Sequence, residues 1–127
     1  MAKKGDLTAQ CCLGDCYKNG KGVPKKDASA FKWYNKAAEN GFAIAQFNLG
    51  VCYDDGEGIT EDKVKAVEWY QKAAEKGHSD AQYNLGFCYN KGEGVTKNDA
   101  IAVEWFKKAA HQGNDRAQFA LRILNKE

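Results

Sequence analysis

Residues 41–76, GFAIAQFNLGVCYDDGEGITEDKVKAVEWYQKAAEK, decide the fold, because the sequence on either side repeats them in register. The following 36 residues carry the same letter at 19 of 36 positions. The same step of 36 residues links sets of glycines, leucines and tryptophans: Gly5, Gly41, Gly77 and Gly113; Leu13, Leu49, Leu85 and Leu121; Trp33, Trp69 and Trp105. A fixed period of this length predicts a repeat architecture.

The chain is predicted to form a single domain built from copies of this unit. Its length of 127 residues is within the range of one ordinary domain. The last segment repeats only the first part of the unit and carries Arg122 where earlier copies have glycine, which is typical of a more polar terminal cap. The predicted domain is 1–127, with repeats 5–40, 41–76 and 77–112 and a C-terminal capping helix in 113–127.

Each copy is predicted to fold as two antiparallel helices, A and B, joined by a glycine-rich turn. In the second copy Ala45, Leu49 and Cys52 recur at the i, i+4, i+7 spacing of one buried helical face. The A helices are predicted at about 7–18, 43–54 and 79–90, and the B helices at about 27–39, 63–75 and 99–111. The fold class is therefore predicted to be all-α.

The helix ends carry sequence signals. Asp62 and Asn98 are predicted to cap the N-termini of their B helices, and Asp27 is predicted to do so in the first copy. A glycine just past each A helix is predicted to adopt the left-handed conformation that ends a helix. These glycines are Gly20, Gly56 and Gly92. A second glycine follows two residues later and allows the chain to reverse, and the apolar residue after it is expected to pack between the helices. The pairs are Gly22 and Val23, Gly58 and Ile59, and Gly94 and Val95.

The B helices combine large rings with paired alanines. Trp69 and Tyr70 are followed by two alanines, and the other copies keep this order, so rings of one helix are predicted to fill the gaps left by alanines of the next. A glycine in mid-helix costs about 1 kcal/mol relative to alanine. Gly14, Gly50 and Gly86 are therefore predicted to mark points where another helix crosses too closely for a methyl group.

The composition excludes some classes of partner. The chain is 43% hydrophobic, enough to form a core, and its net charge is only +2, with basic and acidic residues intermixed. This balance predicts no binding to nucleic acid or to an anionic membrane. No stretch approaches the roughly 20 apolar residues of a membrane span, and the chain begins without the apolar region of a signal peptide. A cytoplasmic location is expected.

The cysteines are predicted to be reduced. Cys16, Cys52 and Cys88 share one repeat position and so lie on successive A helices. Packed helices lie about 8–10 Å apart, whereas a disulfide needs Cα atoms within about 7 Å. These three are therefore predicted to be buried thiols. Cys11 and Cys12 belong to the first copy alone, and Cys12 with Cys16 forms an i, i+4 pair without the further ligands that a zinc site needs. No metal and no cofactor is predicted.

The fixed letters resemble those of the Sel-1-like repeats, which are relatives of the tetratricopeptide repeat. The pattern is A-Q-x-x-L-G-x-x-Y-x-x-G-x-G-V and then A-x-x-W-Y-x-K-A-A-x-x-G, and it covers nearly the whole chain. In the second copy it is carried by Ala45, Gln46, Leu49, Gly50, Tyr53, Gly56, Gly58, Ile59, Ala66, Trp69, Tyr70, Lys72, Ala73, Ala74 and Gly77. The resemblance implies a right-handed α-solenoid superhelix whose A helices line a concave face, and a role as an interaction scaffold.

The resemblance also bears on disulfides. Some exported members of the family place a cysteine cross-link where this chain has Ala38, Ala74, Gln46 and Gln82. That cross-link is absent here, which agrees with the reduced state expected for the other cysteines.

A binding groove is predicted on the A helices, at positions that differ between copies while the core letters stay fixed. Val51 and Phe87 carry this hypothesis, because they are apolar where the first copy has Asp15. A partly exposed apolar strip flanked by charge is typical of a peptide groove. The predicted partner-binding residues are Asp15, Ile44, Val51, Asp54, Asp80, Phe87, Asn90 and Arg116.

The alternative is that such side chains only fill space between neighbouring A helices or lie on solvated surface. Filling is the favoured interpretation for Phe47, Tyr83 and Phe119, and the alternative stays open for the groove residues themselves.

Catalysis is not predicted. Ser29 and Lys32 spell S-x-x-K, the nucleophile motif of penicillin-recognising enzymes, and a β-lactam-interacting relative is a remote alternative. The companion motifs S-D-N and K-T-G are missing, however. His78 and His111 have no carboxylate or cysteine at ligand spacing and are expected on solvated surface.

The predicted function is a non-enzymatic scaffold or adaptor that binds a protein or peptide. An RNA-reading helical array would need a basic groove, whereas this A-helix face mixes aspartates with few bases. The remaining alternative is a structural segment of a larger solenoid. A monomer is expected, with weak end-to-end association as the other possibility.

Overall fold

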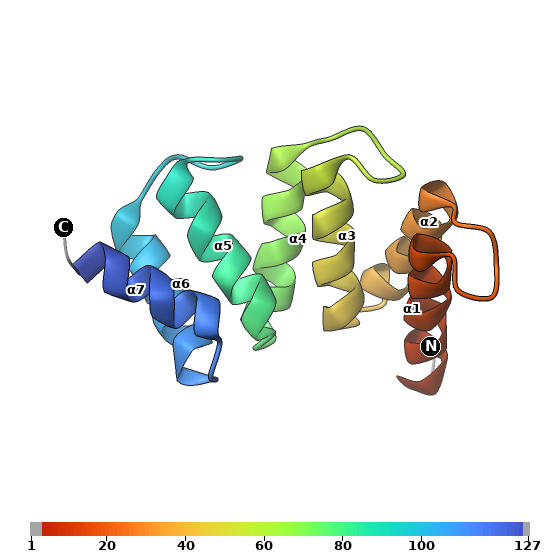
Figure 1. The fold of residues 1–127 in the computed structure, drawn as a ribbon, viewed down its shortest axis with the longest axis horizontal. Helices are drawn as coiled ribbons and strands as arrows, with labels where there is room; N and C mark the ends of the chain where they lie inside the picture. Colours follow the sequence, from red (N-terminus) through yellow and green to blue (C-terminus); the bar gives the residue numbers. More distant parts are fainter. Residues whose placement is uncertain (1–3, 126–127) are drawn as a thin grey trace.

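The computed structural model describes residues 4–125, which form seven α-helices and no strand. The helices are α1 (Lys4–Asn19), α2 (Asp27–Glu39), α3 (Ala43–Asp55), α4 (Lys63–Glu75), α5 (Ser79–Lys91), α6 (Asp99–His111) and α7 (Asp115–Asn125). Each helix packs mainly on the helices before and after it. Figure 1 shows the resulting row from α1 to α7, with the A helices α1, α3, α5 and α7 toward the viewer. The all-α solenoid of antiparallel helix pairs is confirmed.

The predicted helix caps are confirmed in two copies and wrong in the first. The side chains of Asp62 and Asn98 accept hydrogen bonds from the amides of Lys65 and Ile101, each at 3.1 Å. Helix α2 instead begins at Asp27 itself, after Lys26, whose side chain makes no capping bond. The three B helices begin at the same repeat position, and Asp27 lies one residue past the position that Asp62 and Asn98 occupy, inside the first turn. There its carboxylate accepts a hydrogen bond from the Lys25 ammonium at 2.8 Å and cannot reach back to the free amides.

The turn after each A helix needs its glycines for two different reasons. Gly56 and Gly92 end their helices with φ of 71°, as predicted. The second glycine lies against the preceding repeat: a Cβ on Gly58 would come within 2.2 Å of the carbonyl oxygen of Asp27, and one on Gly94 within 2.3 Å of that of Lys63. This glycine therefore permits close packing between repeats as well as chain reversal.

The apolar residue after the second glycine is packed against the core in the third copy and exposed in the second. Val95 packs against the core of the second and third repeats, as predicted. Ile59 is exposed, so the prediction that it packs between the helices is wrong for the second copy.

The core is a chain of small clusters in which one ring per repeat is fully buried. Tyr34, Tyr70 and Phe106 are at most 2% exposed, and each is clustered with buried alanines. Buried leucines and cysteines join the clusters of the two tyrosines. A Cβ on Gly50 would lie 2.7 Å from the Tyr70 ring, and Gly14 and Gly86 face the other two rings in the same way. The prediction of close crossings at the mid-helix glycines is confirmed. The helix that crosses is the B helix of the same repeat.

The tryptophans are only half-buried and link successive repeats. Trp69 packs against the cluster of the first repeat and Trp105 against that of the second. A lysine one turn later covers each ring, with the ammonium of Lys72 4.4 Å from the Trp69 centroid and that of Lys108 4.5 Å from Trp105. Such contacts contribute about 0.5–1 kcal/mol at exposed sites.

A buried glutamine joins each B helix to the next A helix. The amide nitrogen of Gln46 donates to the carbonyl of Ala38 at 3.2 Å, and that of Gln82 to Ala74 at 3.1 Å. Each bond holds the end of a B helix to the A helix of the next repeat.

All five cysteines of the described chain are free. Cys52 and Cys88 are buried as predicted, and burial raises the pKa of each thiol to about 12. Cys16 is only half-buried, because no preceding repeat covers it within the described residues. Cys11 is also buried, and burial raises its pKa to about 11, while Cys12 is exposed. The buried thiols are therefore protonated at neutral pH and packed as small apolar groups.

None of the helices within residues 4–125 is both long enough and apolar enough to cross a membrane.

Candidate functional site

Three adjoining cavities form a groove along the side chains of α3, α5 and α7. The main cleft, of about 630 Å³, runs from α3 across the start of α5 to the turn before α7. The middle cavity, of about 240 Å³, lies between Asp54 and Phe87. The apolar pocket, of about 220 Å³, lies between α5 and α7. Asp54 and Asn84 line both the main cleft and the middle cavity, and Phe87 lines both the middle cavity and the apolar pocket, so the three are continuous.

The main cleft brings four predicted groove residues together. Its lining is Phe47, Val51, Asp54, Asp55, Tyr70, Ser79, Asp80, Asn84, Gln112, Gly113, Asn114, Asp115 and Arg116. Val51 and Asp54 come from α3, Asp80 from the first turn of α5 and Arg116 from α7. Residues from three copies thus contribute to one hollow, as expected for a solenoid groove.

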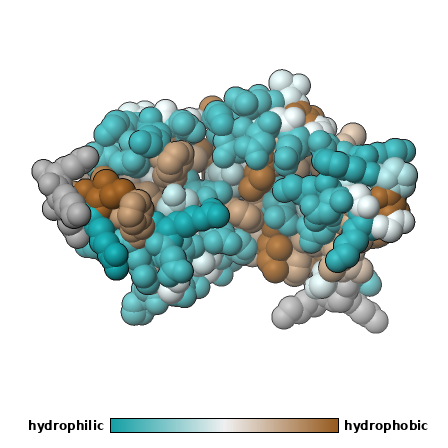
Figure 2. All heavy atoms as spheres, in the orientation of Figure 1, coloured by the Kyte–Doolittle hydropathy of each residue, from teal (hydrophilic) through white to brown (hydrophobic). Residues whose placement is uncertain are grey.

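The apolar pocket holds two more of the predicted residues, Phe87 and Asn90. Phe87 and Asn90 line it from α5, and Arg116 lines it from α7. Phe87 is 39% exposed and Phe119, opposite, is 61% exposed, beside the exposed Ile123. Figure 2 shows apolar side chains gathered over α5 and α7 at the left of the view, with hydrophilic ones around them. The α5–α7 end of the groove therefore presents apolar surface to solvent.

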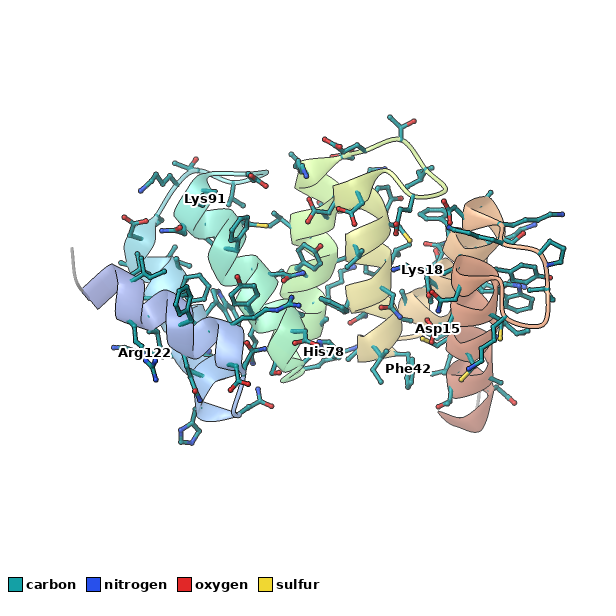
Figure 3. All side chains as sticks on the ribbon, viewed as in Figure 1. Asp15, Lys18, Phe42, His78, Lys91 and Arg122 are labelled. Carbon is teal, nitrogen blue, oxygen red and sulfur yellow. The ribbon has the colours of Figure 1, made fainter. Side chains whose placement is uncertain are left out.

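Asp15 and Ile44 lie outside these cavities. Asp15 is on α1, where it accepts a hydrogen bond from the Tyr34 hydroxyl. Figure 3 shows Asp15 and Lys18 on the α1 side of the structure, far along the row from α7. Lys18 forms an ion pair with Glu57 at 3.6 Å, which ties α1 to the turn of the second copy. Ile44 is exposed at the start of α3.

Asp54 is held in place by two donors. Its carboxylate pairs with the Lys63 ammonium and accepts a hydrogen bond from the Tyr70 hydroxyl at 2.9 Å. Burial, and then the nearby Asp54 charge, raise the pKa of Tyr70, so this hydroxyl stays protonated and donates. Asp54 thereby joins α3 to α4 and is already partly neutralised. The other aspartates of the cleft have no cationic partner among the ion pairs of the described residues.

His78 does not lie on solvated surface, so that prediction is wrong. Its ring stacks on Phe47 with centroids 4.8 Å apart. Its Nδ1 accepts a hydrogen bond from the amide of Ala81 at 3.1 Å and so caps α5. Figure 3 shows His78 at the start of α5, beside the groove. His111, by contrast, is exposed as expected.

The capping bond makes the stability of the chain depend on pH. Burial lowers the pKa of His78 below its ordinary value of 6.5, against the opposing effect of Asp80. A lowered pKa means that the unfolded state binds the proton more readily. The contribution of His78 to the free energy of unfolding should therefore be largest above about pH 6.5. It should decrease as the pH falls from there through the lower pKa of the folded state. A protonated Nδ1 also loses its ability to accept from Ala81.

The measurement is urea unfolding between pH 7.5 and 5, followed by circular dichroism. His78→Asn keeps a capping acceptor without a titrating ring and should flatten the decrease over this range, whereas His111→Asn should leave it unchanged. Equal slopes in both variants would show that carboxylates, and not His78, cause the decrease.

Several groove residues carry no predictive signal in the sequence. Tyr70 is one of the fixed repeat letters, and Asn84 is the same residue as Asn48 in the preceding copy. Asn114 donates to the Asp80 carboxylate at 3.0 Å and caps α7 through the amide of Ala117, so a terminal turn forms one wall. Asp115, by contrast, could have been found from the sequence. It lies two residues after Gly113 of the 36-residue series, where the capping helix is expected to begin.

Two other hollows lie over the B helices but are lined largely by long polar side chains of a single helix. One, of about 520 Å³, is formed mainly by α4 around Trp69, and the other, of about 570 Å³, mainly by the end of α6 around His111.

Ser29 and Lys32 of the S-x-x-K motif lie on α2 and line none of the hollows described here. Among the described residues, no group of three or more His, Cys, Asp or Glu side chains is placed to hold a metal ion.

The fold and groove define a helical repeat protein of the solenoid class, with residues from successive repeats lining one face. The chain belongs to the Sel1 repeat family: the family pattern matches residues 8–42, 43–78 and 79–114. Proteins of this family are generally scaffolds for protein interaction, and the fold is typically non-enzymatic. No curated protein matches the chain.

Several solved structures are similar to this chain, and three of them are described below. One is c5321, a protective antigen present in uropathogenic Escherichia coli strains, which is 45% identical to this chain with a TM-score of 0.87. The match covers 90% of this chain and 24% of c5321. This chain is 46% identical, with a TM-score of 0.86, to a Sel1 repeat protein from Oxalobacter formigenes, over 88% of this chain and 46% of that one. Cysteine rich protein B of Helicobacter pylori is 27% identical, with a TM-score of 0.77, over 91% of this chain and 90% of its own. The chain thus spans less than half the length of the first two.

Proposed function

We propose that this protein is a non-enzymatic scaffold that binds a peptide segment of another protein in the α3–α5–α7 groove. The observation that carries the proposal is the combination of a conserved frame with a variable lining. The buried rings and alanines keep the same letters in each copy, whereas Val51 and Phe87 occupy the position of Asp15. Positions that differ between copies of a repeated frame, several of which line one continuous hollow, are expected where a surface has been adapted to a ligand.

The exposed apolar side chains support this use of the groove. Phe87, Phe119 and Ile123 lie together at the apolar pocket although each is more than a third exposed. Covering a large side chain contributes roughly 1.5–3 kcal/mol to an association. One apolar residue of a partner placed in this pocket would therefore account for much of the affinity.

The test uses a random-peptide library displayed on phage, with the folded protein as the target. We expect the selected peptides to bind the wild-type protein in solution and Phe87→Asp to weaken that binding by at least about tenfold, since the loss of one well-placed anchor costs more than about 1 kcal/mol. Because Phe87 is partly exposed, the unfolding midpoint should change little.

Val64→Asp is the matched control, because Val64 is an apolar residue 58% exposed on α4 and outside the groove. It should leave peptide binding unchanged. Binding that survives Phe87→Asp, or that falls equally with Val64→Asp, would show that the groove is not the binding site. A large loss of stability in Phe87→Asp would assign Phe87 to the core.

A second candidate role is a structural segment of a larger solenoid. It is favoured by the α1–α2 edge, where Gly22 has open space although Gly58 and Gly94 meet the backbone of a neighbouring repeat. Another repeat of the same kind could pack there. In that case size-exclusion chromatography would show association that increases with protein concentration and does not depend on reductant, whereas the scaffold proposal predicts a monomer.

A further inference from the structure

We propose that the peptide held by the groove carries a basic side chain in the main cleft and an apolar side chain in the apolar pocket. This inference rests on the proposed function and specifies its partner as a cationic–apolar segment. Two independent features carry it: the difference in charge between the two ends of the groove, and the exposed apolar surface at only one of them.

The main cleft is acidic. Four aspartates line it against a single arginine: Asp54, Asp55, Asp80 and Asp115 against Arg116. Lys63 already neutralises Asp54, but Asp55 and Asp115 are exposed and take part in none of the ion pairs. The C-terminal end of α3 brings partial negative charge to the cleft and the N-terminal ends of α5 and α7 bring partial positive charge, so its acidity comes from the aspartate side chains. A cation entering the cleft would meet net negative charge on more than one side.

Apolar side chains in the cleft can accept the rest of a basic side chain. Phe47 and Val51, both half-buried, line the cleft, whereas the Tyr70 ring is only 1% exposed and offers no free face. Arginine and lysine bury their methylene stems on apolar surface while the charged head stays among acids, and a ring face attracts the cation. The cleft therefore suits an arginine or lysine better than a small polar residue.

The apolar pocket has the opposite character. Its charged border is positive, formed by Lys91 and Arg116, and the Lys91 ammonium lies 5.9 Å from the centroid of the Phe87 ring. A basic residue placed there would be repelled, whereas an aliphatic or aromatic residue would cover Phe87 and Phe119. The groove thus favours one orientation of the segment, with the cation toward α3 and the apolar residue toward α7.

The two subsites are close enough for one short peptide. Arg116 lines both the main cleft and the apolar pocket, and the middle cavity joins them. An extended chain advances about 3.3 Å per residue. A few residues between the basic and the apolar side chain would therefore suffice.

The experiment reads the sequences that the random-peptide library yields and measures synthetic copies of the strongest binders by fluorescence anisotropy. We expect the peptides to share a lysine or arginine a few positions from a large apolar residue. Replacing that basic residue by glutamate should weaken binding at least about tenfold, since like charges brought together across an interface cost several kcal/mol. Added salt should weaken the basic peptides as well.

Charge reversal in the protein provides the complementary test. The double variant Asp55→Lys/Asp115→Lys should lose the basic peptides and prefer their glutamate versions, while Glu104→Lys, an exposed acid on α6 outside the groove, should change nothing. Selection of acidic or uncharged peptides, or an unchanged preference in the double variant, would overturn this inference. The proposed function would still stand if Phe87→Asp weakened the binding of those peptides. Absence of any binder sensitive to Phe87→Asp would overturn both.

Discussion

Gly58→Ala is expected to destabilise the protein by about 3 kcal/mol, and Gly22→Ala, at the same position of the preceding copy, by only about 1 kcal/mol. Both glycines have positive φ, 76° and 79°, so a side chain strains the backbone equally at the two sites. Only Gly58 faces a neighbour: an added Cβ would lie 2.2 Å from the carbonyl oxygen and 2.6 Å from the carbonyl carbon of Asp27. Gly22 has no atom within 4 Å of that point.

The difference between the two variants therefore isolates the contact between repeats. A backbone carbonyl cannot rotate away as a flexible side chain can, so the second repeat would have to move off the first. In a repeat protein, stability depends on the interfaces between neighbours. Gly58→Ala is thus expected to reduce the cooperativity of unfolding as well as its midpoint.

The measurement is urea unfolding of wild type, Gly22→Ala and Gly58→Ala, followed by circular dichroism and by tryptophan fluorescence. The two probes should coincide for Gly22→Ala and separate for Gly58→Ala. Equal losses in the two variants would mean that backbone strain alone accounts for both glycines, and that the inter-repeat contact contributes nothing.

The helices could be predicted because each local signal occurs three times. The B-helix bounds 27–39, 63–75 and 99–111 agree with α2, α4 and α6, and the glycines that end the A helices have the expected left-handed backbone. The two exceptions have different causes. Asp27 fails as a cap because it lies one residue past the N-cap position that Asp62 and Asn98 occupy, whereas no local pattern shows that Gly58 touches the preceding repeat.

The groove could be predicted less completely than the fold. Val51, Asp54, Phe87 and their neighbours were found because a changed letter on a fixed frame marks a face that the core does not use. Asp15 and Ile44 meet the same criterion but lie away from the cavities: Asp15 is on α1, which lines none of the three, and Ile44 is at the start of α3, before the residues of that helix that line the main cleft. Which copies take part depends on the path of the stack, which periodicity does not give.

Phe47 and His78 show how one position can serve both core and site. Phe47 was expected to fill space, and it does contact the Tyr70 ring, but it also lines the main cleft and supports the His78 ring. His78 has no equivalent in the other copies, which have Asp6, Phe42 and Asn114 at its position. A residue that appears once in the repeat series offers no periodic evidence, and its stacking partner is known only from the structure.

Gly50→Ala is expected to destabilise the protein by about 1–2 kcal/mol, although alanine is the better helix former by about 1 kcal/mol. Its Cβ would lie 2.7 Å from two carbons of the Tyr70 ring and 3.3 Å from the carbonyl oxygen of Ala66. The ring is 1% exposed, and its hydroxyl is fixed by Asp54, so it has no open space to move into. The clash should therefore outweigh the gain in helix propensity.

Arg122 provides the control, because it occupies the same repeat position in α7 and is exposed, with no ring from a B helix over it within the described residues (Figure 3). At this site the order should reverse, and Arg122→Ala should be more stable than Arg122→Gly by up to about 1 kcal/mol. Urea midpoints of the four chains would decide the matter. If alanine were favoured over glycine at both positions, the Tyr70 ring could not be the reason for the glycine, and close crossing of the two helices would no longer explain the repeat.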